Sequence, residues 1–338
     1  MSETTTSPAT PEAIAQAAEL IRAGELVAFP TETVYGLGGN AREAHAVAKI
    51  FTAKERPQDN PLIVHFTERA QAEELAREIP PKARALMDAF WPGPLSIVLK
   101  KSALVPNEAT AGLDTVVLRC PSHPVARALI DAAGVPIAAP SANRSGRPSP
   151  TRAEHVHADL AGRIPLILDA GPVEHGLEST VLDLTTQPPT LLRPGSVTRE
   201  ALEAVIGPIT HRTEASDAAH PRAPGMKYRH YAPEAHLTLV CGAQDARREA
   251  LRERAAAAAG RGEVVGRIIL GSTEDTDPFC RVLGPTPREY AAGLFGALRE
   301  LDEAGVTCIF AEGVDEAHLG AAVMDRLRKA ADEVVSVS

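Results

Sequence analysis

A short proline-flanked loop, residues 54–62, carries the charges that most suggest chemistry. Its two prolines restrict the backbone, so that Lys54, Arg56 and Asn60 project from a segment of limited freedom. Lysine supplies a point charge and arginine a planar fork of donors, and together they suit a phosphate or a carboxylate. A solvated charged loop is the alternative interpretation of this segment taken alone.

Two other polar segments follow buried apolar runs directly. Residues 30–41 read PTETVYGLGGNA, and residues 140–150 read PSANRSGRPSP. Loops at strand ends are where α/β proteins commonly bind ligands. The first of these segments contains none of the standard glycine-rich phosphate motifs, so those loop types are excluded for it. The hydroxyl, amide and backbone donors indicate a differently built nucleotide or anion site.

Residues 223–233, APGMKYRHYAP, are unusual for a linker. A plain linker needs neither aromatic rings nor a cluster of basic groups. The segment lies in a stretch where apolar periodicity vanishes and proline, alanine and glycine are frequent. We therefore predict that it folds over a site as a lid.

Alternating short apolar runs and amphipathic stretches must position these loops. Strands are predicted at residues 26–29, 62–66, 95–99, 115–119, 136–139, 166–169 and 180–184. Helices are predicted at residues 11–23, 44–53, 68–78, 82–89, 123–133, 152–160 and 199–205. The pattern indicates an α/β domain with a twisted, mixed sheet. Residues 1–10 are expected to be a disordered tail and residues 30–41 a loop.

A second strand-helix alternation follows the linker. Strands are predicted at residues 237–241, 264–270 and 306–311, and helices at residues 243–259, 287–304 and 316–331. Such alternation favours a small Rossmann-like α/β domain with a parallel sheet. The predicted organisation is a catalytic domain at 11–207, a linker or lid at 208–236 and a C-terminal domain at 237–338.

Length and charge agree with this division and bear on function. A chain of 338 residues with 44% hydrophobic residues has material for two globular domains. It has 35 basic and 44 acidic residues, a net charge of −9. Proteins that bind mainly to nucleic-acid phosphates are usually basic, so the composition argues against a nucleic-acid-binding protein.

The cysteines and the hydropathy indicate a cytoplasmic protein. Cys120, Cys241, Cys280 and Cys308 form no paired motif, which argues against zinc or disulfides and for a reducing compartment. No apolar run reaches the roughly 18 residues that span a bilayer. The polar N-terminus lacks the order of a signal peptide, so we expect no association with a membrane.

At these motifs the sequence resembles the threonylcarbamoyl-AMP synthases in their longer form, which joins a YrdC-like domain to an additional C-terminal domain. The Lys-x-Arg and Ser-x-Asn motifs of that family stand here as Lys54-Glu55-Arg56 and Ser141-Ala142-Asn143. The PTETVYG, EST, LRPG and PGMKYRHYAP segments also look like family segments, in family order. From residue 237 on, the resemblance lies in the domain arrangement rather than in a motif.

The resemblance implies a nucleotidyltransferase. L-Threonine, bicarbonate and ATP would give threonylcarbamoyl-AMP and pyrophosphate, with Mg²⁺ accompanying ATP. The product would pass to a tRNA threonylcarbamoyl transferase complex, which modifies the adenosine next to the anticodon. Direct binding of tRNA by this chain is not expected.

The resemblance also implies residue roles. Lys54 and Arg56 would be catalytic, and no metal ligand is assigned. The threonine-binding residues would be Thr33, His65, Arg119, the backbone at Ala139, and Ser179. The ATP-binding residues would be Arg56, Asn60, Thr115, Ser141, Asn143, Ser149, Arg193 and, from the linker, Tyr231.

The chemistry and the residues are compatible, because joining two anionic reactants needs positive charge and positioning more than a covalent nucleophile. One alternative is an RNA-binding YrdC-like module without synthase activity, whose affinity would fall steeply with salt. Another is a carbamoyltransferase of the hydrogenase-maturation kind. That enzyme would bring zinc-finger cysteines and an extra N-terminal domain, which the sequence does not match.

Overall fold

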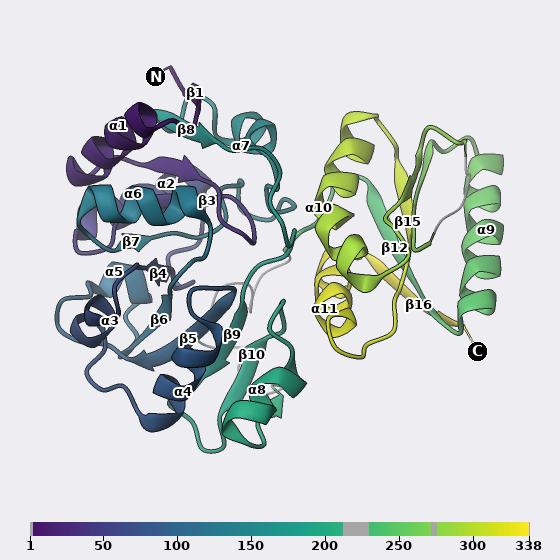
Figure 1. Ribbon diagram of the computed structural model, residues 1–338. Helices are drawn as coiled ribbons and strands as arrows, with labels where there is room; N and C mark the ends of the chain where they lie inside the picture. The colour runs from purple at the N-terminus through teal and green to yellow at the C-terminus, as the bar shows by residue number, and fades with distance from the viewer. Residues whose placement is uncertain (1–2, 212–229, 272–275, 338) are drawn as a thin grey trace. The chain divides into compact units, whose positions relative to one another are not determined.

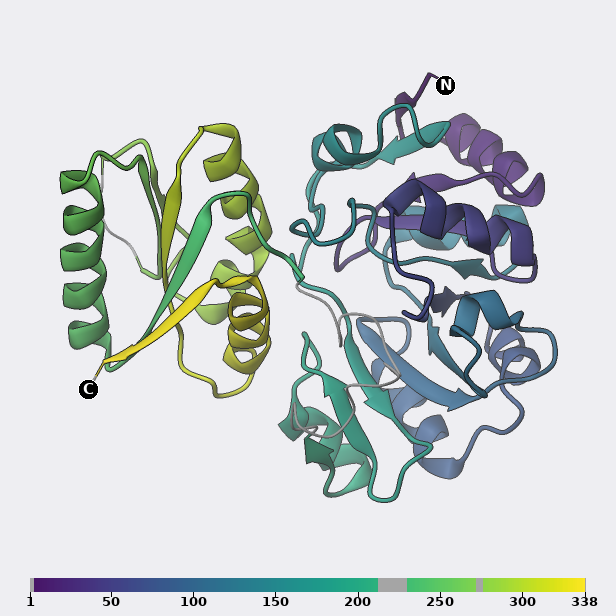
Figure 2. The same cartoon turned by 180° about the vertical axis from the view of Figure 1, so that it is seen from behind.

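The computed structural model describes residues 3–211, 230–271 and 276–337. The chain divides into two compact units. The first comprises residues 1–145, 149–174 and 178–228, and the second comprises residues 146–148, 175–177 and 229–338. Both are α/β, as predicted (Figures 1 and 2). Most of the predicted linker, residues 212–229, lies outside the described residues.

Within the described residues the first unit forms a mixed sheet of 11 strands in the order β1-β8-β2-β3-β7-β4-β6-β5-β9-β10-β11. The strands are β1 (Thr5–Pro8), β2 (Val27–Phe29), β3 (Gly36–Asn40), β4 (Ile63–His65), β5 (Leu95–Lys100), β6 (Thr115–Arg119), β7 (Ile137–Ala138), β8 (Leu166–Asp169), β9 (Thr180–Asp183), β10 (Thr190–Arg193) and β11 (Thr210–His211).

The helices of this unit begin where the sequence offers caps. The Thr10 hydroxyl accepts from the amide of Ala13, and Pro11 occupies the first helical position of α1. Thr198 caps α8 in the same way. The helices are α1 (Pro11–Arg22), α2 (Ala44–Lys54), α3 (Arg69–Leu75), α4 (Pro81–Phe90), α5 (Asn107–Thr110), α6 (Pro124–Ala133), α7 (Ala153–Leu160) and α8 (Arg199–Ile206).

Two predictions for the N-terminal part were wrong. Residues 5–8 pair with β8 as strand β1 rather than forming a disordered tail. Residues 36–40, expected in a loop, form β3 antiparallel to β2. A Cβ on Gly38 would lie 2.7 Å from atoms of Phe29 and Ile137, so glycine is needed there for close packing across the sheet. Turn-like composition therefore hid a strand.

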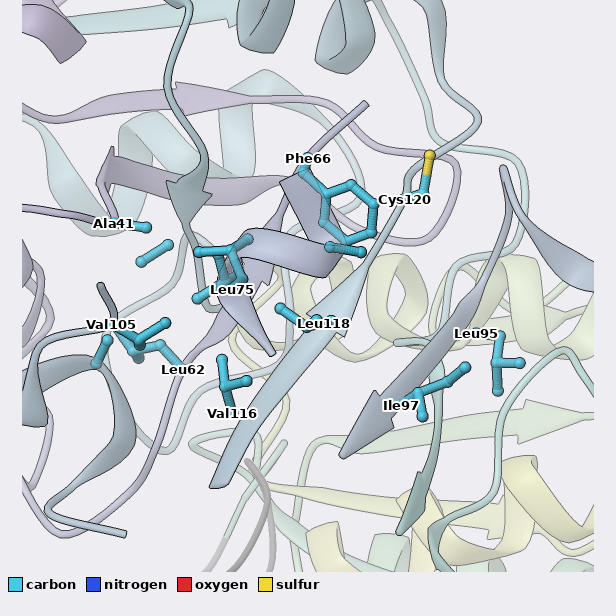
Figure 3. Close-up of a cluster of buried hydrophobic side chains, with 14 of the residues drawn as sticks. Ala41, Leu62, Phe66, Leu75, Leu95, Ile97, Val105, Val116, Leu118 and Cys120 are labelled. Carbon is cyan, nitrogen blue, oxygen red and sulfur yellow. The ribbon is translucent and has the colours of Figure 1, made fainter. Parts of the chain in front are cut away.

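The sheet of the first unit has two differently covered faces. The larger core cluster packs α2, α3, α4, α7 and α8 against one face. Figure 3 shows part of this cluster, including Leu75 of α3 and Ile97 and Leu118 of the sheet. A second cluster packs α1 and α6 over β2, β7 and β8 on the other face (Figure 1). On that second face, the neighbouring strands β4, β5, β6, β9 and β10 contribute a small cluster made of strand residues alone. This helix-free part of the sheet carries the site.

In the described residues of the second unit, five parallel strands lie in the order β14-β13-β15-β12-β16, which confirms the predicted Rossmann-like sheet. Helix α9 covers one face, and α10 and α11 cover the other (Figures 1 and 2). Strands β14 and β16 were not predicted. The elements are β12 (His236–Gly242), α9 (Gln244–Gly260), β13 (Val265–Ile269), β14 (Cys280–Val282), α10 (Pro287–Glu303), β15 (Cys308–Glu312), α11 (Gly320–Ala330) and β16 (Glu333–Val337).

None of the described helices is long and apolar enough to cross a bilayer.

Candidate functional site

The register of two parallel strands brings the first two candidate residues together. In the β4–β6 pair, Ile63 lies beside Val117 and His65 beside Arg119. Side chains two residues apart share a sheet face, so all four lie on one face. His65 and Arg119 thus stand side by side at the carboxyl ends of β4 and β6, although they are distant in sequence.

This pair lies on the face that also carries α1 and α6. In the antiparallel β4–β7 pair, His65 is opposite Ile137, which belongs to the α1–α6 cluster. The ring of Phe29, also in that cluster, meets the His65 ring edge to face, with centroids 6.5 Å apart. The cluster of helices therefore forms one wall beside the paired histidine and arginine.

Arg119 is held by the loop between β2 and β3. Its Nη1 donates to the Thr33 hydroxyl at 3.0 Å, and its Nη2 lies 2.8 Å from Oε1 of Glu32. Thr31 fixes the loop, because its hydroxyl accepts from the amides of Thr33 and Val34 and bonds to the Thr33 hydroxyl. Thr33 and Arg119, both expected at a threonine site, are therefore in direct contact.

The protonation states in this cluster follow from burial and charge. Burial raises the pKa of Glu32, but the Arg119 guanidinium outweighs it and lowers that pKa to about 2. Burial lowers the pKa of His65 to about 3, and the charge of Arg119 contributes in the same direction. At neutral pH the cluster contains a carboxylate, a guanidinium and a neutral imidazole.

Several buried polar atoms here lack a hydrogen-bond partner of good geometry. They are both carboxylate oxygens of Glu32, Nη2 of Arg119, Nδ1 of His65 and the side-chain amide of Asn60. Each of these residues is at most 3% exposed. Buried polar groups are normally hydrogen-bonded because an unmade bond is costly. Those of Glu32, His65 and Arg119 lie together at the carboxyl ends of β4 and β6, which indicates a place for a polar ligand there, whereas Asn60 lies towards the amino ends.

Ser179 and Ala139 complete the expected threonine set. The Ser179 hydroxyl lies 2.8 Å from that of Ser96, which is buried and stands next to Arg119 across the β5–β6 pair. The Ala139 amide donates to the carbonyl of Ile63 at 2.9 Å and is therefore not available to a ligand. The structure thus brings Thr33, Arg119 and Ser179 to one end of the strands.

The expected ATP residues start from the opposite end of the same strands. Thr115 opens β6, and Asn60 lies three residues before β4, at the amino ends of this parallel pair. Thr115 and Arg119 are separated by four residues, or about 13 Å of strand. Arg56 joins this end, because its Nη2 donates to the Pro61 carbonyl at 3.2 Å and its Nε to the Asn60 carbonyl at 3.4 Å.

The side chain of Lys54 is buried and donates its hydrogen bonds to another segment of the protein. Its side chain is 1% exposed, and its Nζ donates to the backbone carbonyls of Ser141 and Asn143 and to Oδ1 of Asn143. The Ser141 hydroxyl also donates to Oδ1 of Asn143. The two motifs of the sequence analysis are therefore one hydrogen-bonded unit, in which Lys54 fixes the backbone of the 141–143 loop.

Two residues expected to bind ATP, Ser149 and Arg193, form hydrogen bonds with residues outside the expected ATP set. The Ser149 hydroxyl donates to the buried carboxylate of Glu178. Arg193 donates from Nε to the Ser179 carbonyl at 3.0 Å and from Nη2 to its hydroxyl at 3.2 Å. Arg193 and Ser179 are thus adjacent, which makes them the meeting point of the two sets.

The sequence analysis missed Glu32, Ser96 and Glu178. Glu32 and Glu178 lie inside motifs that were singled out, PTETVYG and EST, so their position was a usable signal. Ser96 lies in an ordinary apolar strand, and only the β5–β9 and β5–β6 pairings place it beside Ser179 and Arg119.

Tyr231 belongs to the second unit. It is buried there, stacks on Phe295 with ring centroids 5.2 Å apart, and has the Arg326 guanidinium over its ring at 5.5 Å. Its φ of +66° is unusual for a non-glycine residue. The preceding residues 212–229 lie outside the described part, so the role of Tyr231 at ATP stays a prediction.

The resemblance implies that Mg²⁺ accompanies ATP. The described residues contain no group of three or more His, Cys, Asp or Glu side chains that could hold an ion. Magnesium in nucleotide sites is usually bound through the phosphates and one or two protein groups. The donor set is compatible with that mode, and the structure assigns no metal ligand.

Comparison with known proteins covers nearly the whole chain. A family model described as "Telomere recombination" matches residues 19–195, and a model described as "Threonylcarbamoyl-AMP synthase, C-terminal domain" matches residues 197–332. A threonylcarbamoyl-AMP synthase of Pyrococcus abyssi is 52% identical over 318 residues, covering 93% of this chain and 92% of the relative. One of Bacillus subtilis is 49% identical over 328 residues, covering 94% and 92%.

A solved structure agrees with the same assignment. The crystal structure of P. abyssi Sua5 complexed with L-threonine has a TM-score of 0.94 and 48% sequence identity, and the match covers 100% of both chains. These matches support the synthase interpretation over that of an RNA-binding module.

Proposed function

The chain belongs to the threonylcarbamoyl-AMP synthase family in its two-domain form, and we propose that it makes threonylcarbamoyl-AMP and pyrophosphate from L-threonine, bicarbonate and ATP. The observation that carries this proposal is the buried Arg119 guanidinium beside neutral His65, with unfilled hydrogen-bonding capacity around both. A guanidinium in such a setting is suited to a carboxylate. The P. abyssi relative is solved with L-threonine, which agrees with this assignment.

The threonine carboxylate would bind Arg119, with Thr33 and Ser179 supplying hydroxyl contacts. His65 and the backbone at Ala139 complete this half of the site. Since the Ala139 amide is already bonded to Ile63, its contribution would come from the carbonyl oxygen. Because His65 is neutral, one ring nitrogen can accept a hydrogen bond from the amine or hydroxyl of threonine.

ATP would lie along the residues Arg56, Asn60, Thr115, Ser141, Asn143, Ser149 and Arg193. Arg56 and Arg193 supply positive charge, and the hydroxyls and amides supply neutral donors. The resemblance makes Lys54 and Arg56 catalytic. The hydrogen bonds of Lys54 support a positioning role for it, since they fix the loop that presents Ser141 and Asn143.

Two bonds form in the reaction. The threonine nitrogen bonds to the carbon of bicarbonate, with loss of water, and a carbamate oxygen bonds to the α-phosphorus of ATP. The bond between the α-phosphorus and the bridging oxygen breaks, and pyrophosphate leaves with that electron pair. The meeting of Arg193 with Ser179 would bring the carbamate next to the nucleotide, so positioning supplies much of the rate.

Mg²⁺ is part of the proposal and would arrive with ATP, where it offsets phosphate charge. We further propose a cytoplasmic enzyme, in keeping with the free cysteines at 120, 241, 280 and 308. Its product would pass to a tRNA threonylcarbamoyl transferase complex. The net charge of −9 fits a chain that meets tRNA only through this small molecule.

The test is a reconstituted reaction followed by pyrophosphate release and by the mass of the product, with each substrate omitted in turn. Formation of threonylcarbamoyl-AMP only when all three substrates are present is expected. Arg56→Ala should abolish product formation and keep the native circular dichroism spectrum. Arg42→Ala removes a solvent-exposed arginine that pairs with Glu74 and should leave the rate unchanged. ATP turnover that ignores threonine or bicarbonate contradicts the proposal.

The proposed contact of Tyr231 with ATP needs a variant that spares its packing. Tyr231→Ala would remove a ring stacked on Phe295 and disturb the second unit itself. Tyr231→Phe keeps the ring and removes only the hydroxyl. A weaker affinity for ATP in Tyr231→Phe supports a hydroxyl contact, and an unchanged affinity contradicts it.

A further inference from the structure

Glu32 is a buried carboxylate in the middle of the threonine half of the site. Its side chain is 3% exposed, and Oε1 lies 2.8 Å from Nη2 of Arg119. Glu32 is flanked in sequence by Thr31 and Thr33, whose hydroxyls contact each other and, in the case of Thr33, Arg119. The proposed reaction has so far given this carboxylate no role.

The loop does not need the Glu32 carboxylate for its conformation. The turn is closed by the Thr31 hydroxyl, which accepts from the amides of Thr33 and Val34 and donates to the Val34 carbonyl. The Glu32 carboxylate instead interacts with the Arg119 guanidinium and with the backbone amides of Glu32 and Ser122, which lower its pKa, although none of these contacts has ideal hydrogen-bond geometry. Replacing a buried ion pair as a whole by apolar side chains of similar volume is often neutral for stability, because desolvation offsets the attraction. Fold stability is therefore a poor explanation for a charge at this position.

The charges in this cluster balance. Arg119 contributes one positive charge, Glu32 one negative charge, and His65 is neutral at physiological pH. Arg193, which is bonded to Ser179, is assigned to the ATP half of the site. The cluster of Glu32, His65 and Arg119 therefore has no net charge. A free amino acid is a zwitterion and has no net charge either.

We propose that Glu32 is the specificity-determining and positioning residue of the threonine pocket, where it orients Arg119 and balances its charge so that a zwitterionic amino acid binds and a simple monoanion does not. This inference rests on the proposed function, because that function supplies threonine as the occupant.

The competing anion is present in the reaction itself. Bicarbonate is a small planar monoanion, and an arginine without a balancing carboxylate would bind it with its paired donors. Glu32 opposes this binding in two ways. It occupies one side of the guanidinium, and it repels any ligand that brings only negative charge. A ligand with a nearby ammonium group is spared that repulsion. Specificity of this kind comes from rejecting the wrong ligand as well as binding the right one.

The proposal is tested by isothermal titration of the full chain, without ATP, with two ligands. One is L-threonine, and the other is 2,3-dihydroxybutyrate, in which a hydroxyl replaces the amine. The unaltered protein should bind threonine at least about tenfold more tightly. In Glu32→Gln, which has nearly the same shape, that preference should fall by about 10- to 100-fold, the range expected for one charge-assisted contact. Arg193 is unchanged in both proteins, so its attraction for anions cancels in the comparison.

Two further variants separate charge from structure. Glu25→Gln removes an exposed carboxylate paired with Lys49 and should leave the preference unchanged. Glu32→Asp keeps the charge on a shorter side chain, so it should bind threonine less tightly and yet retain the preference. In steady-state assays, Glu32→Gln alone should be inhibited by raised bicarbonate in competition with threonine. A role in folding alone would move none of these ratios.

The outcomes are distinguishable. A folded Glu32→Gln protein with the unaltered preference overturns the inference, and so does a Glu32→Asp protein that loses the preference. If Glu32→Gln does not fold, the inference is tested on the unaltered protein, because equal affinity of that protein for L-threonine and 2,3-dihydroxybutyrate overturns it. Failure of the unaltered protein to bind threonine contradicts the proposed function instead.

Discussion

Each unit of the molecule buries a glutamate beside an arginine, and the two pairs differ in how fully their hydrogen bonds are used. In the second unit, Oε1 of Glu312 accepts from Arg247 and Arg248, and Oε2 accepts from the amide of Leu270. In the first unit, Glu32 and Nη2 of Arg119 face each other without a hydrogen bond of good geometry. Glu312 is saturated and Glu32 is not.

The difference separates a structural charge from a functional one. A buried carboxylate with four donors has no capacity left for a ligand. It joins the end of β15 to α9 and to the residue after β13, and Arg247 in turn donates to the Gly242 carbonyl of β12. A buried pair with open capacity is costly unless something completes it. The comparison therefore predicts that changes at Glu312 affect folding alone, whereas changes around Glu32 affect substrate binding as well as stability.

The largest effect is expected at Glu312. Glu312→Gln leaves two arginines without their shared carboxylate and should destabilise the second unit by about 3–5 kcal/mol. Urea unfolding followed by circular dichroism measures this. Glu300→Gln, which removes an exposed partner of Arg281, should cost less than about 1 kcal/mol. Similar losses in both variants would show that saturation of Glu312 is not what matters.

The second effect is the acid sensitivity of the Glu32–Arg119 pair. The pKa of Glu32 is lowered from 4.5 to about 2 in the folded protein, so the pair's contribution is complete above pH 4.5 and is lost as the pH falls towards 2. The size is about 3 kcal/mol, from the shift in pKa. The stability gap between the unaltered protein and Glu32→Gln should close over this range, as followed by the fluorescence of the single tryptophan. A gap that persists at pH 2 contradicts the assignment.

The third effect concerns Arg119. Arg119→Ala removes the partner of the substrate carboxylate and should weaken threonine binding by about 10- to 100-fold, as measured by titration calorimetry. Arg247→Ala, the matching change in the saturated pair, should leave the threonine affinity of the folded protein unchanged. The contrast between the two regions fails if both substitutions weaken threonine binding equally.

The smallest expected effect is that threonine affinity stays nearly constant near neutral pH, because His65 does not titrate there. A histidine of ordinary pKa would make threonine binding change near pH 6.5, but burial and Arg119 lower the pKa of His65 to about 3. Threonine affinity should therefore vary less than about twofold between pH 5.5 and 7.5. NMR of the imidazole protons checks the cause directly, since His65 should not shift in this range. An inflection near pH 6.5 that disappears in His65→Asn would contradict the buried, neutral state.

Much of the local structure was predictable because its causes are local. Thr10 and Pro11 indicate the start of α1, and the apolar runs ending at His65 and Arg119 indicate β4 and β6. Strand β3 was not predictable from composition. Its glycines resemble a turn, and only the close approach of Phe29 and Ile137 explains them.

The candidate site was also only partly predictable from the sequence. The motifs identified the loops that carry Thr33, Lys54 and Ser141, because those residue types and spacings are visible in the sequence. The motifs did not show that Lys54 holds the backbone of the 141–143 loop, since that contact joins distant segments. Glu32 lies inside one of these motifs, but only the folded chain shows that its carboxylate faces the guanidinium of Arg119.

The sequence by itself determined the α/β class, the two-domain organisation and the identities of the polar residues available for binding. Tertiary structure alone decided which of them meet. The β4–β6 register sets His65 beside Arg119, and a shift of one residue would turn both strands' side chains to opposite faces. That register depends on contacts among many strands at once, whereas helix caps and apolar periods depend only on near neighbours. Charge balance at Glu32, which requires both partners in place, is consequently a property of the folded chain.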